Sequence, residues 1–339
     1  MNPPQAPQLP SRGWIVRTPI WARVFVIGLL AWAITAGTAM TTNDTTLIPS
    51  VILIGSFLIP VTFLAWVLGR QKAAGRDSGI TPTALTTDRV LTGFVLSGLF
   101  GLSLAAYLEI KLLATHPILF YGGVAVIEEL LKLLLIILVG QGLAYYSRRD
   151  GMVLGAAIGF GFSAFESAGY AFNTIVESRS IEWHLLLETE MVRGLLSPVG
   201  HGLWSALVGG ALFHAASKHH NRFRITGEVI VWYVVAVVLH VIWDTAAGIA
   251  VALTLWSTGE PASMRIVQNG RIPNPTQTQA NLDQAFDWLL LGISSAVGIF
   301  LAVWQWRRGR AEAELLHQDS VRQQSEPTTV GQPGDLDSP

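Results

Sequence analysis

The sequence predicts an all-α, polytopic membrane helix bundle, with about eight transmembrane helices around a four-helix core. Hydrophobic residues make up 51% of the 339 residues and charged residues only 13%, against roughly 25% charge in an average soluble domain. The mean hydropathy is +0.46. These values place the chain in the membrane class. Its net charge of -1 gives no reason to expect a nucleic-acid partner.

The chain is expected to divide into three parts. Residues 1–20 are polar and Pro-rich, so we predict a disordered cytoplasmic arm. Residues 21–306 form the predicted integral membrane helical domain. Residues 307–339 are predicted to be a polar, mostly disordered cytoplasmic tail, with a short amphipathic continuation through Ala311–Leu316. The absence of cysteine excludes disulfides, thiolate metal sites and a Cys nucleophile.

Eight apolar runs are predicted to cross a hydrocarbon core of about 30 Å. In chain order they are Val24–Thr38, Ile48–Gly69, Val90–Tyr107, Pro117–Tyr146, Met152–Phe172, Val192–Phe213, Glu228–Leu255 and Phe286–Trp304. The first run is short and ends at small residues, so a cleaved signal peptide is the alternative to a span there. Polar segments, Asn173–Met191 and Ser257–Gln284, are expected on the outer side.

The basic residues fix the expected orientation. They cluster after alternate runs, at Arg70 and Lys72, Arg148 and Arg149, Lys218, Arg222 and Arg224, and Arg307, Arg308 and Arg310. Because Lys and Arg are retained on the cytoplasmic side, we predict an integral plasma membrane protein with both termini in the cytoplasm.

The fourth run carries three charged residues where hydrocarbon is expected, Glu128, Glu129 and Lys132. Ionisable groups at membrane depth usually face a bundle interior or a wet cavity and mark functional sites. The spacing lets Lys132 pair with either glutamate one turn away. A buried ion pair that only fixes helix packing is the alternative. One lysine cannot neutralise two carboxylates, however, which favours a functional role.

Three further runs carry polar residues of the same kind: Glu166 on the fifth, His201 on the sixth, and His240 with Asp244 on the seventh. Counting along ideal helices from the nearest cytoplasmic charged residue places each of them, with the fourth-run residues, at a depth of roughly 24 to 30 Å. We therefore predict one polar layer in the outer half of the membrane. Taken singly, Glu166 is also compatible with a packing role, and His201 with an interhelical hydrogen bond.

Local spacing supports convergence of these residues. Asp244 lies one helical turn after His240, where it can orient the ring. Gly155 and Gly159 offer a face for close helix approach, and Pro198 is expected to loosen the backbone just before the sixth-run histidine. The other charged residues are expected to be solvated, and Arg193 to extend to the membrane surface. The solvated set comprises Glu109, Lys111, His116, His214, His219 and His220.

Together these strings resemble the PrsW branch of intramembrane proteases, which is related to the CPBP and CAAX prenyl endopeptidase superfamily. The strings are EELLK (Glu128–Lys132), FSAFE (Phe162–Glu166), His201 and HVIWD (His240–Asp244). The resemblance covers roughly residues 117–255, the predicted catalytic core. The CAAX relatives have a histidine where Glu166 stands, so the pattern favours the PrsW branch.

The resemblance implies hydrolysis of a peptide bond in a membrane-anchored protein on the outer side. The implied substrate is a single-span protein such as an anti-sigma factor, cut at site 1 in stress signalling. Glu128 or Glu129 is the expected base, with Lys132 and Glu166 as partners that set its protonation. The remaining residues are expected to bind a divalent metal, with zinc as the first candidate, or to act directly on the oxyanion and leaving amine. The predicted metal ligands are Glu166, His201, His240 and Asp244.

Two other function classes are compatible with such a layer. A proton- or cation-coupled transporter also uses Glu, His and Asp chains in mid-membrane, although no half-to-half symmetry is evident. A membrane binding or chaperone-like protein would keep the layer without catalysis. The sequence gives no signal for oligomeric state or for a particular substrate.

Overall fold

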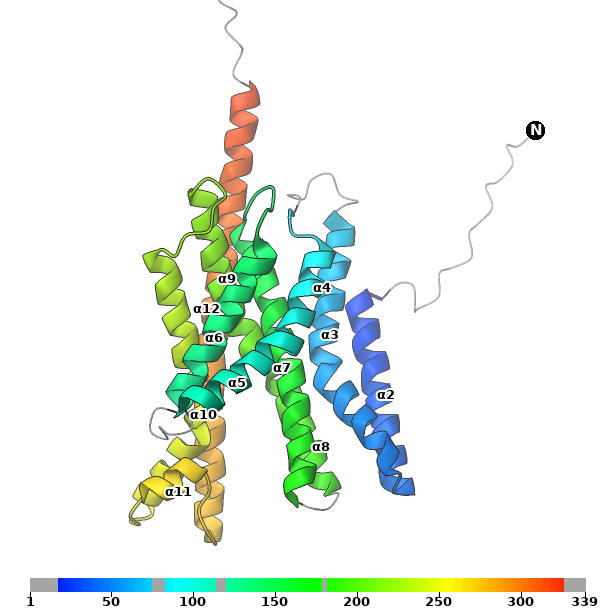
Figure 1. The fold of residues 1–339 in the computed structure, drawn as a ribbon, viewed down its shortest axis with the longest axis vertical. Helices are drawn as coiled ribbons and strands as arrows, with labels where there is room; N and C mark the ends of the chain where they lie inside the picture. The colour runs from blue at the N-terminus through cyan, green and yellow to red at the C-terminus, as the bar shows by residue number, and fades with distance from the viewer. Residues whose placement is uncertain (1–17, 75–82, 114–119, 179–181, 326–339) are drawn as a thin grey trace, which may run out of the picture.

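The computed structural model describes residues 18–74, 83–113, 120–178 and 182–325, and every regular element in these ranges is helical (Figure 1). The predicted all-α class is confirmed. Most of the predicted N-terminal arm and the end of the predicted tail lie outside the described residues. Residues 18–20 and 307–325 are described.

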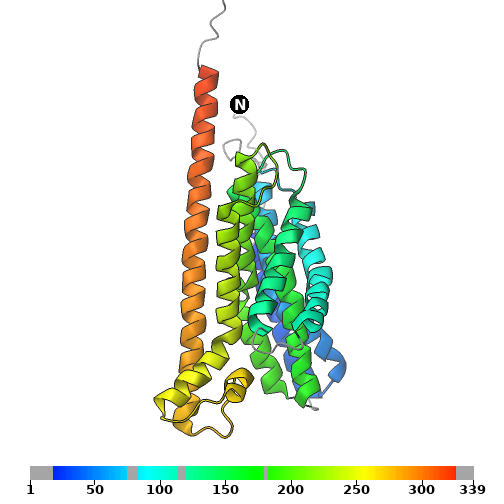
Figure 2. The same cartoon turned by 60° about the vertical axis from the view of Figure 1, so that its left-hand side comes forward.

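The long helical segments run along the bundle (Figures 1 and 2). Their bounds are α2 Ile20–Thr42, α3 Ile48–Ala74, α4 Thr87–Leu96, α5 Leu102–Leu113, α6 Phe120–Gly140, α7 Arg148–Ser178, α8 Trp183–Leu196, α9 His201–Lys218, α10 Gly227–Ser257, α11 Met264–Asn269 and α12 Gln277–Ser325. Single short turns, η1 Thr45–Leu47, η2 Ser97–Gly101 and η4 Ser197–Val199, lead into α3, α5 and α9. Helix α4 thus continues through a short turn into α5, as α8 does into α9.

Seven helical segments of the described chain are long and apolar enough to cross a membrane. Helix α6 lies beside them with 21 residues, enough for about 30 Å, but it carries Glu128, Glu129 and Lys132 in its middle. The described part of the bundle therefore consists of seven apolar segments and the charged helix α6, which corresponds to the predicted fourth run.

The segment before His201 differs from the prediction. Much of the expected outer loop Asn173–Met191 is helical, because α7 continues to Ser178 and α8 begins at Trp183. Leu186 of α8 is fully buried against Ile48, Ile52 and Ala171, and this packing holds the helix against α3 and α7. The predicted sixth span is thus two helices joined by the turn η4.

The C-terminal helix also extends beyond the predicted span. Helix α12 passes Trp304 and continues to Ser325, so the predicted tail is helical over 307–325. Two contacts stabilise the stretch of α12 where the predicted span ends and the predicted tail begins. The Arg149 guanidinium lies 4.4 Å from the Trp306 ring centroid, and Glu312 pairs with the buried Arg148 at 3.1 Å.

Helices α7 and α9 form the tightly packed centre of the bundle. A Cβ atom added at Gly155 would lie 2.1 Å from the Ser205 carbonyl oxygen, and one added at Gly159 would lie 2.1 Å from the His201 carbonyl oxygen. Only glycine permits this backbone approach. The predicted close contact is therefore present, and it fixes the position of His201 against α7.

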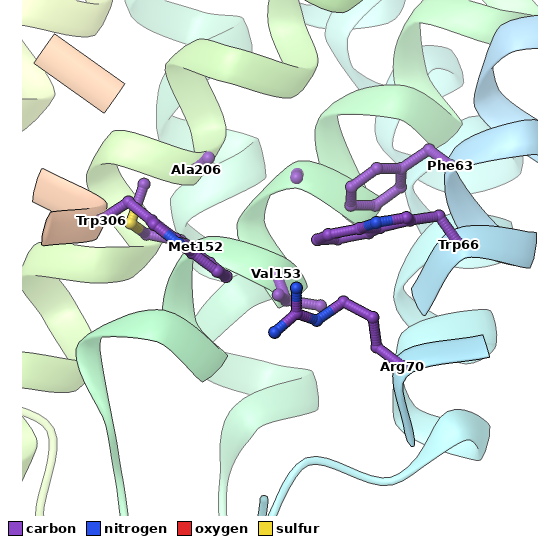
Figure 3. Close-up of a pocket in the computed structure, with 8 residues that line it drawn as sticks. Phe63, Trp66, Arg70, Met152, Val153, Ala206 and Trp306 are labelled. Atoms are coloured by element: carbon purple, nitrogen blue, oxygen red, sulfur yellow. The ribbon is translucent and has the colours of Figure 1, made fainter. Parts of the chain in front are cut away.

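A cavity of about 260 Å³ lies among α3, α7, α9 and α12, towards the end of the bundle where the basic clusters gather (Figure 3). Its walls are largely aromatic and aliphatic. They are formed by Phe63, Trp66, Arg70, Met152, Val153, Ala156, Ala206 and Trp306.

Candidate active site and metal centre

Helix α6 contributes a buried lysine held between two buried carboxylates. The Lys132 ammonium donates to Glu128 Oε2 at 3.1 Å and to Glu129 Oε1 at 2.8 Å. It also lies 4.2 Å from the centroid of the Phe162 ring. Less than a tenth of each of the three charged side chains is exposed. The predicted one-turn pairings are both formed, so the lysine partly offsets two negative charges.

His201 links α9 to α6 and α7. Its Nδ1 lies 2.8 Å from Lys132 Nζ and its Nε2 lies 3.1 Å from Glu166 Oε2. An ammonium group has no acceptor, so Nδ1 must accept and the proton must lie on Nε2, from which it is donated to Glu166. Glu166 therefore fixes both the tautomer and the orientation of this ring.

His240 on α10 is surrounded by carboxylates. Its Nδ1 lies 3.1 Å from Glu129 Oε1, and its Nε2 lies 3.3 Å from Asp244 Oδ2 and 3.8 Å from Glu128 Oε2. A neutral imidazole has one N–H, so it can satisfy a carboxylate on one side only. The other side requires a second proton or a bound cation. A position between His240 Nε2 and the facing carboxylates is therefore electrostatically suited to a cation.

Aromatic side chains close the inner side of the site. The ring of Trp204 stacks on His240 at 4.8 Å and meets His201 edge-on at 5.0 Å. The opposite side is more open, since the side chains of Arg193, Asp244 and Glu166 are 27%, 24% and 16% exposed. The polar cluster is therefore partly exposed on the side formed by α7, α8 and α10.

Arg193 is a site residue that the sequence reasoning missed. Its Nη2 donates to Glu166 Oε2 at 2.7 Å, and its Nε donates to Ser167 Oγ at 3.1 Å. Its guanidinium also lies 4.1 Å from the Tyr170 ring centroid. The expectation that Arg193 extends to the membrane surface is therefore wrong. The excess of carboxylates over cations in the predicted layer was the available signal.

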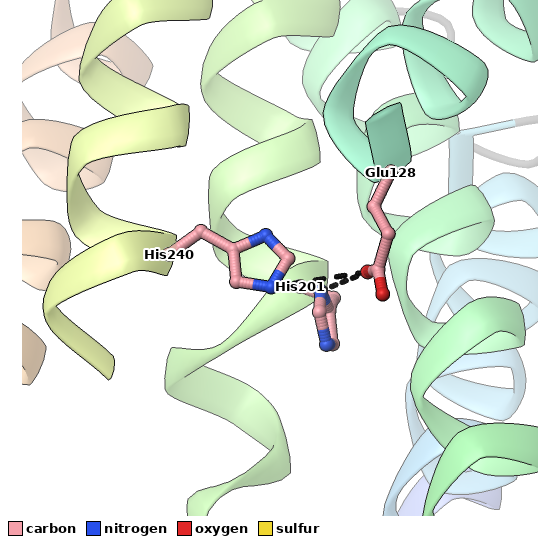
Figure 4. A group of neighbouring side chains, drawn as sticks. All are labelled: Glu128, His201 and His240. Carbon is pink, nitrogen blue, oxygen red and sulfur yellow. Dashed lines mark ion pairs between the residues drawn. The ribbon is translucent and has the colours of Figure 1, made fainter. Parts of the chain in front are cut away.

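A group of three possible metal-ligand residues is present, which shares His201 and His240 with the predicted set and includes Glu128 in place of Glu166 and Asp244. Glu128, His201 and His240 each offer one ligand atom, and these atoms all lie within 4.8 Å of one another (Figure 4). Two histidines and one carboxylate are a common protein ligand set of catalytic zinc sites, in which a fourth position stays open. This donor set therefore fits a divalent metal.

The other predicted ligands have different positions. Glu166 lies behind His201 rather than beside His240, which explains why Glu128 takes its place in the set. Asp244 remains next to His240 Nε2 at 3.3 Å. Glu129 Oε2 is buried and has no hydrogen-bond partner among the described residues. The seven predicted site residues thus share one cluster and occupy different places within it.

Comparison with known proteins places this cluster in a family. No curated protein and no solved structure matches the chain significantly. A protein-family model described as "PrsW family intramembrane metalloprotease" matches residues 81–264, which is more than half of the chain. The matched range contains every residue of the cluster, from Glu128 to Asp244. The chain therefore belongs to the PrsW family of intramembrane metalloproteases.

Proposed function

We propose that this protein uses a zinc ion, held by Glu128, His201 and His240, to hydrolyse a peptide bond in a single-span membrane protein. The observation that carries the proposal is the convergence of these three ligands, with each histidine bonded to a carboxylate through a ring nitrogen. Such carboxylate–histidine pairs orient the rings of metal ligands. The proposed catalytic core is residues 117–255.

The roles of the chain's own residues follow from their contacts. Glu166 orients His201, and Glu129 orients His240. A divalent ion bound at the ligand set supplies Lewis-acid polarisation of the scissile carbonyl. Lys132 stabilises the two adjacent carboxylates, so that they persist side by side in a buried position.

Glu129 is the proposed general base. Its Oε2 has no hydrogen-bond partner in the part of the chain that the structure describes, so this atom is available to take a proton from the attacking water. The water oxygen then bonds to the carbonyl carbon, the C–N bond breaks, and the proton passes to the leaving amine. Glu128 is then a ligand rather than the base, which assigns different roles to the two adjacent glutamates.

The proposed route for proton exchange with solvent runs through His240. Glu129 Oε1 lies 3.1 Å from His240 Nδ1, and His240 Nε2 lies 3.3 Å from Asp244. The Asp244 side chain is 24% exposed, whereas that of Glu129 is fully buried. A proton can therefore leave the buried base without opening the bundle.

The finer identity of the substrate is also part of the proposal. We infer cleavage in the outer half of the bilayer, with an anti-sigma factor as the substrate at site 1. The basic clusters at one end of the bundle support a plasma-membrane orientation with both termini in the cytoplasm. A relation to the CPBP and CAAX endopeptidase superfamily rests on the sequence strings.

Reconstitution with a cleavable reporter tests the proposal. The full-length protein is placed in liposomes with a single-span reporter, and product is followed with and without a chelator and with added zinc. We expect zinc-dependent cleavage that Glu129→Gln and His240→Ala each abolish. Glu190→Gln is the matched control, because this buried α8 carboxylate bonds Ser56, outside the cluster.

Two outcomes would reject the protease reading. If wild type and variants leave every reporter equally intact, the protein is not a protease for these reporters and the proposed activity is rejected. Release of a trapped solute on acidification, lost in the same variants, would instead support the transporter. Full cleavage by protein with a negligible zinc content would reject the proposed role of zinc and support a protease that does not need it.

A further inference from the structure

The cavity between α3 and α12 lies away from the candidate active site. Met152 and Val153 of α7 form its back wall together with Ala206 of α9 (Figure 3). Val153 precedes Glu166 by thirteen residues, about 20 Å along an ideal helix. The cavity is therefore separate from the candidate active site.

Two indole rings form opposite walls of this cavity. Trp66 of α3, with Phe63 beside it, faces Trp306 of α12 across the opening (Figure 3). Tryptophan is enriched at the depth of the lipid headgroups. Trp306 directly precedes the basic residues Arg307 and Arg308, which are typical of the same depth. The opening is therefore expected where lipid headgroups and acyl chains meet.

Among the described residues that line the cavity, Arg70 is the one that carries a charge. Its guanidinium lies 5.2 Å from the Trp66 ring centroid and points towards the opening (Figure 3). Within the described ranges no carboxylate forms an ion pair with it. The cavity thus combines an apolar slot with an arginine at its rim, which is complementary to an anionic amphiphile.

We propose that this cavity binds an anionic phospholipid, with the phosphate at Arg70 and part of one acyl chain between Trp66 and Trp306. The volume of about 260 Å³ is below the roughly 300–1,000 Å³ typical of small-molecule sites, so it suits a single chain better than a bulky ligand. Basic pockets between membrane helices bind anionic headgroups in this way. The lipid would join α3 to α12 on the face of the α7–α9 pair.

Native mass spectrometry of the full-length protein tests the site. The protein in detergent is titrated with phosphatidylglycerol or phosphatidylcholine of identical chains. We expect preferential retention of one phosphatidylglycerol. Arg70→Gln should lower its affinity about fivefold, from the contribution of one basic residue near an anionic surface, and leave phosphatidylcholine unchanged. Val153→Phe, which fills the slot, should weaken both lipids.

Arg307→Gln is the matched control, because Arg307 is exposed on α12 and lies outside the cavity lining. Equal losses in Arg70→Gln and Arg307→Gln would show general surface attraction and overturn the site. Retention of both lipids by Val153→Phe would also overturn it. If glycerol phosphate displaces bound phosphatidylglycerol as strongly as free lipid does, the proposed binding of an acyl chain in the cavity is excluded.

Each variant is first compared with wild type by thermal unfolding without lipid. Val153→Leu, a smaller change, replaces Val153→Phe if the larger side chain prevents folding. Reporter cleavage in neutral detergent is expected to remain unchanged in Arg70→Gln. Lipid binding and proteolysis therefore succeed or fail independently.

Discussion

Under the proposed function, substitution of Glu166 by glutamine is expected to weaken zinc binding while leaving the three proposed ligands in place. Glu166 Oε2 accepts from His201 Nε2 at 3.1 Å and from Arg193 Nη2 at 2.7 Å. Glutamine has nearly the same shape, but its amide carries no charge and presents a donor in one of its two orientations. The orientation of His201 is then no longer fixed by a carboxylate.

The expected magnitude follows from the position of Glu166 behind a ligand. Loss of such a partner typically reduces metal affinity 10- to 100-fold, which corresponds to about 1.4 to 2.7 kcal/mol. This range agrees with the roughly 1.5–3 kcal/mol assigned to a hydrogen bond with a charged group. His240→Ala removes a ligand itself, so its effect is expected to exceed that of Glu166→Gln.

Competition against a fluorescent zinc chelator measures the affinity of each purified variant in detergent. Glu190→Gln again serves as the control, since Glu190 is a buried α8 carboxylate that accepts a hydrogen bond from Ser56 Oγ, away from His201 and His240. The reasoning is refuted if Glu166→Gln binds zinc as tightly as the Glu190→Gln control. A loss as large as that of His240→Ala would instead make Glu166 a direct ligand, as the sequence predicted.

Three further perturbations test the arrangement around the ligands. Lys132→Met should destabilise the fold by about 3–5 kcal/mol, because it leaves buried carboxylates unpaired, and a second change, Glu129→Gln, should recover part of the thermal midpoint. Gly159→Ala should reduce cleavage about 100-fold, since the new Cβ would lie 2.1 Å from the His201 carbonyl oxygen and displace this proposed ligand. Gly169→Ala is the control: nothing lies within 4 Å of its added Cβ atom, so this variant should cleave normally. Arg193→Gln should lower kcat by about tenfold, with partial recovery in Arg193→Lys, because the interaction with Glu166 is only partly shielded from water; an unchanged kcat in Arg193→Gln would contradict the positioning role.

The sequence predicted the polar cluster well because helix geometry links sequence position to depth. Glu128, Glu129 and Lys132 had to share a face by their spacing. Equal distances from the basic ends brought His201 and His240 to the same level. Close contact of α7 and α9 also followed directly from the glycine spacing. These features depend on rise and periodicity, which hydropathy and residue type reveal.

The arrangement within the cluster depended on features that periodicity does not reveal. The positions of Glu166 behind His201 and of Glu128 beside both histidines depend on helix rotation and side-chain rotamers. Arg193 was missed because its place near the end of the predicted sixth span suggested that its side chain extends to the membrane surface, whereas the structure directs it to Glu166 and Ser167. The sequence showed an excess of carboxylates over cations in the polar layer, but it did not show that Arg193 lies beside Glu166.

The interruption before α9 also determines the electric field at the site. It makes His201 the first residue of an 18-residue helix, and aligned peptide dipoles give such an end about half a positive charge. In a continuous helix this residue would lie near the middle, where the electric fields of the peptide dipoles on either side largely cancel. Hydrolysis creates negative charge on the former carbonyl oxygen. If the proposed site hydrolyses a peptide bond, the helix end next to His201 would favour the transition state through backbone polarity, which no side-chain substitution would remove.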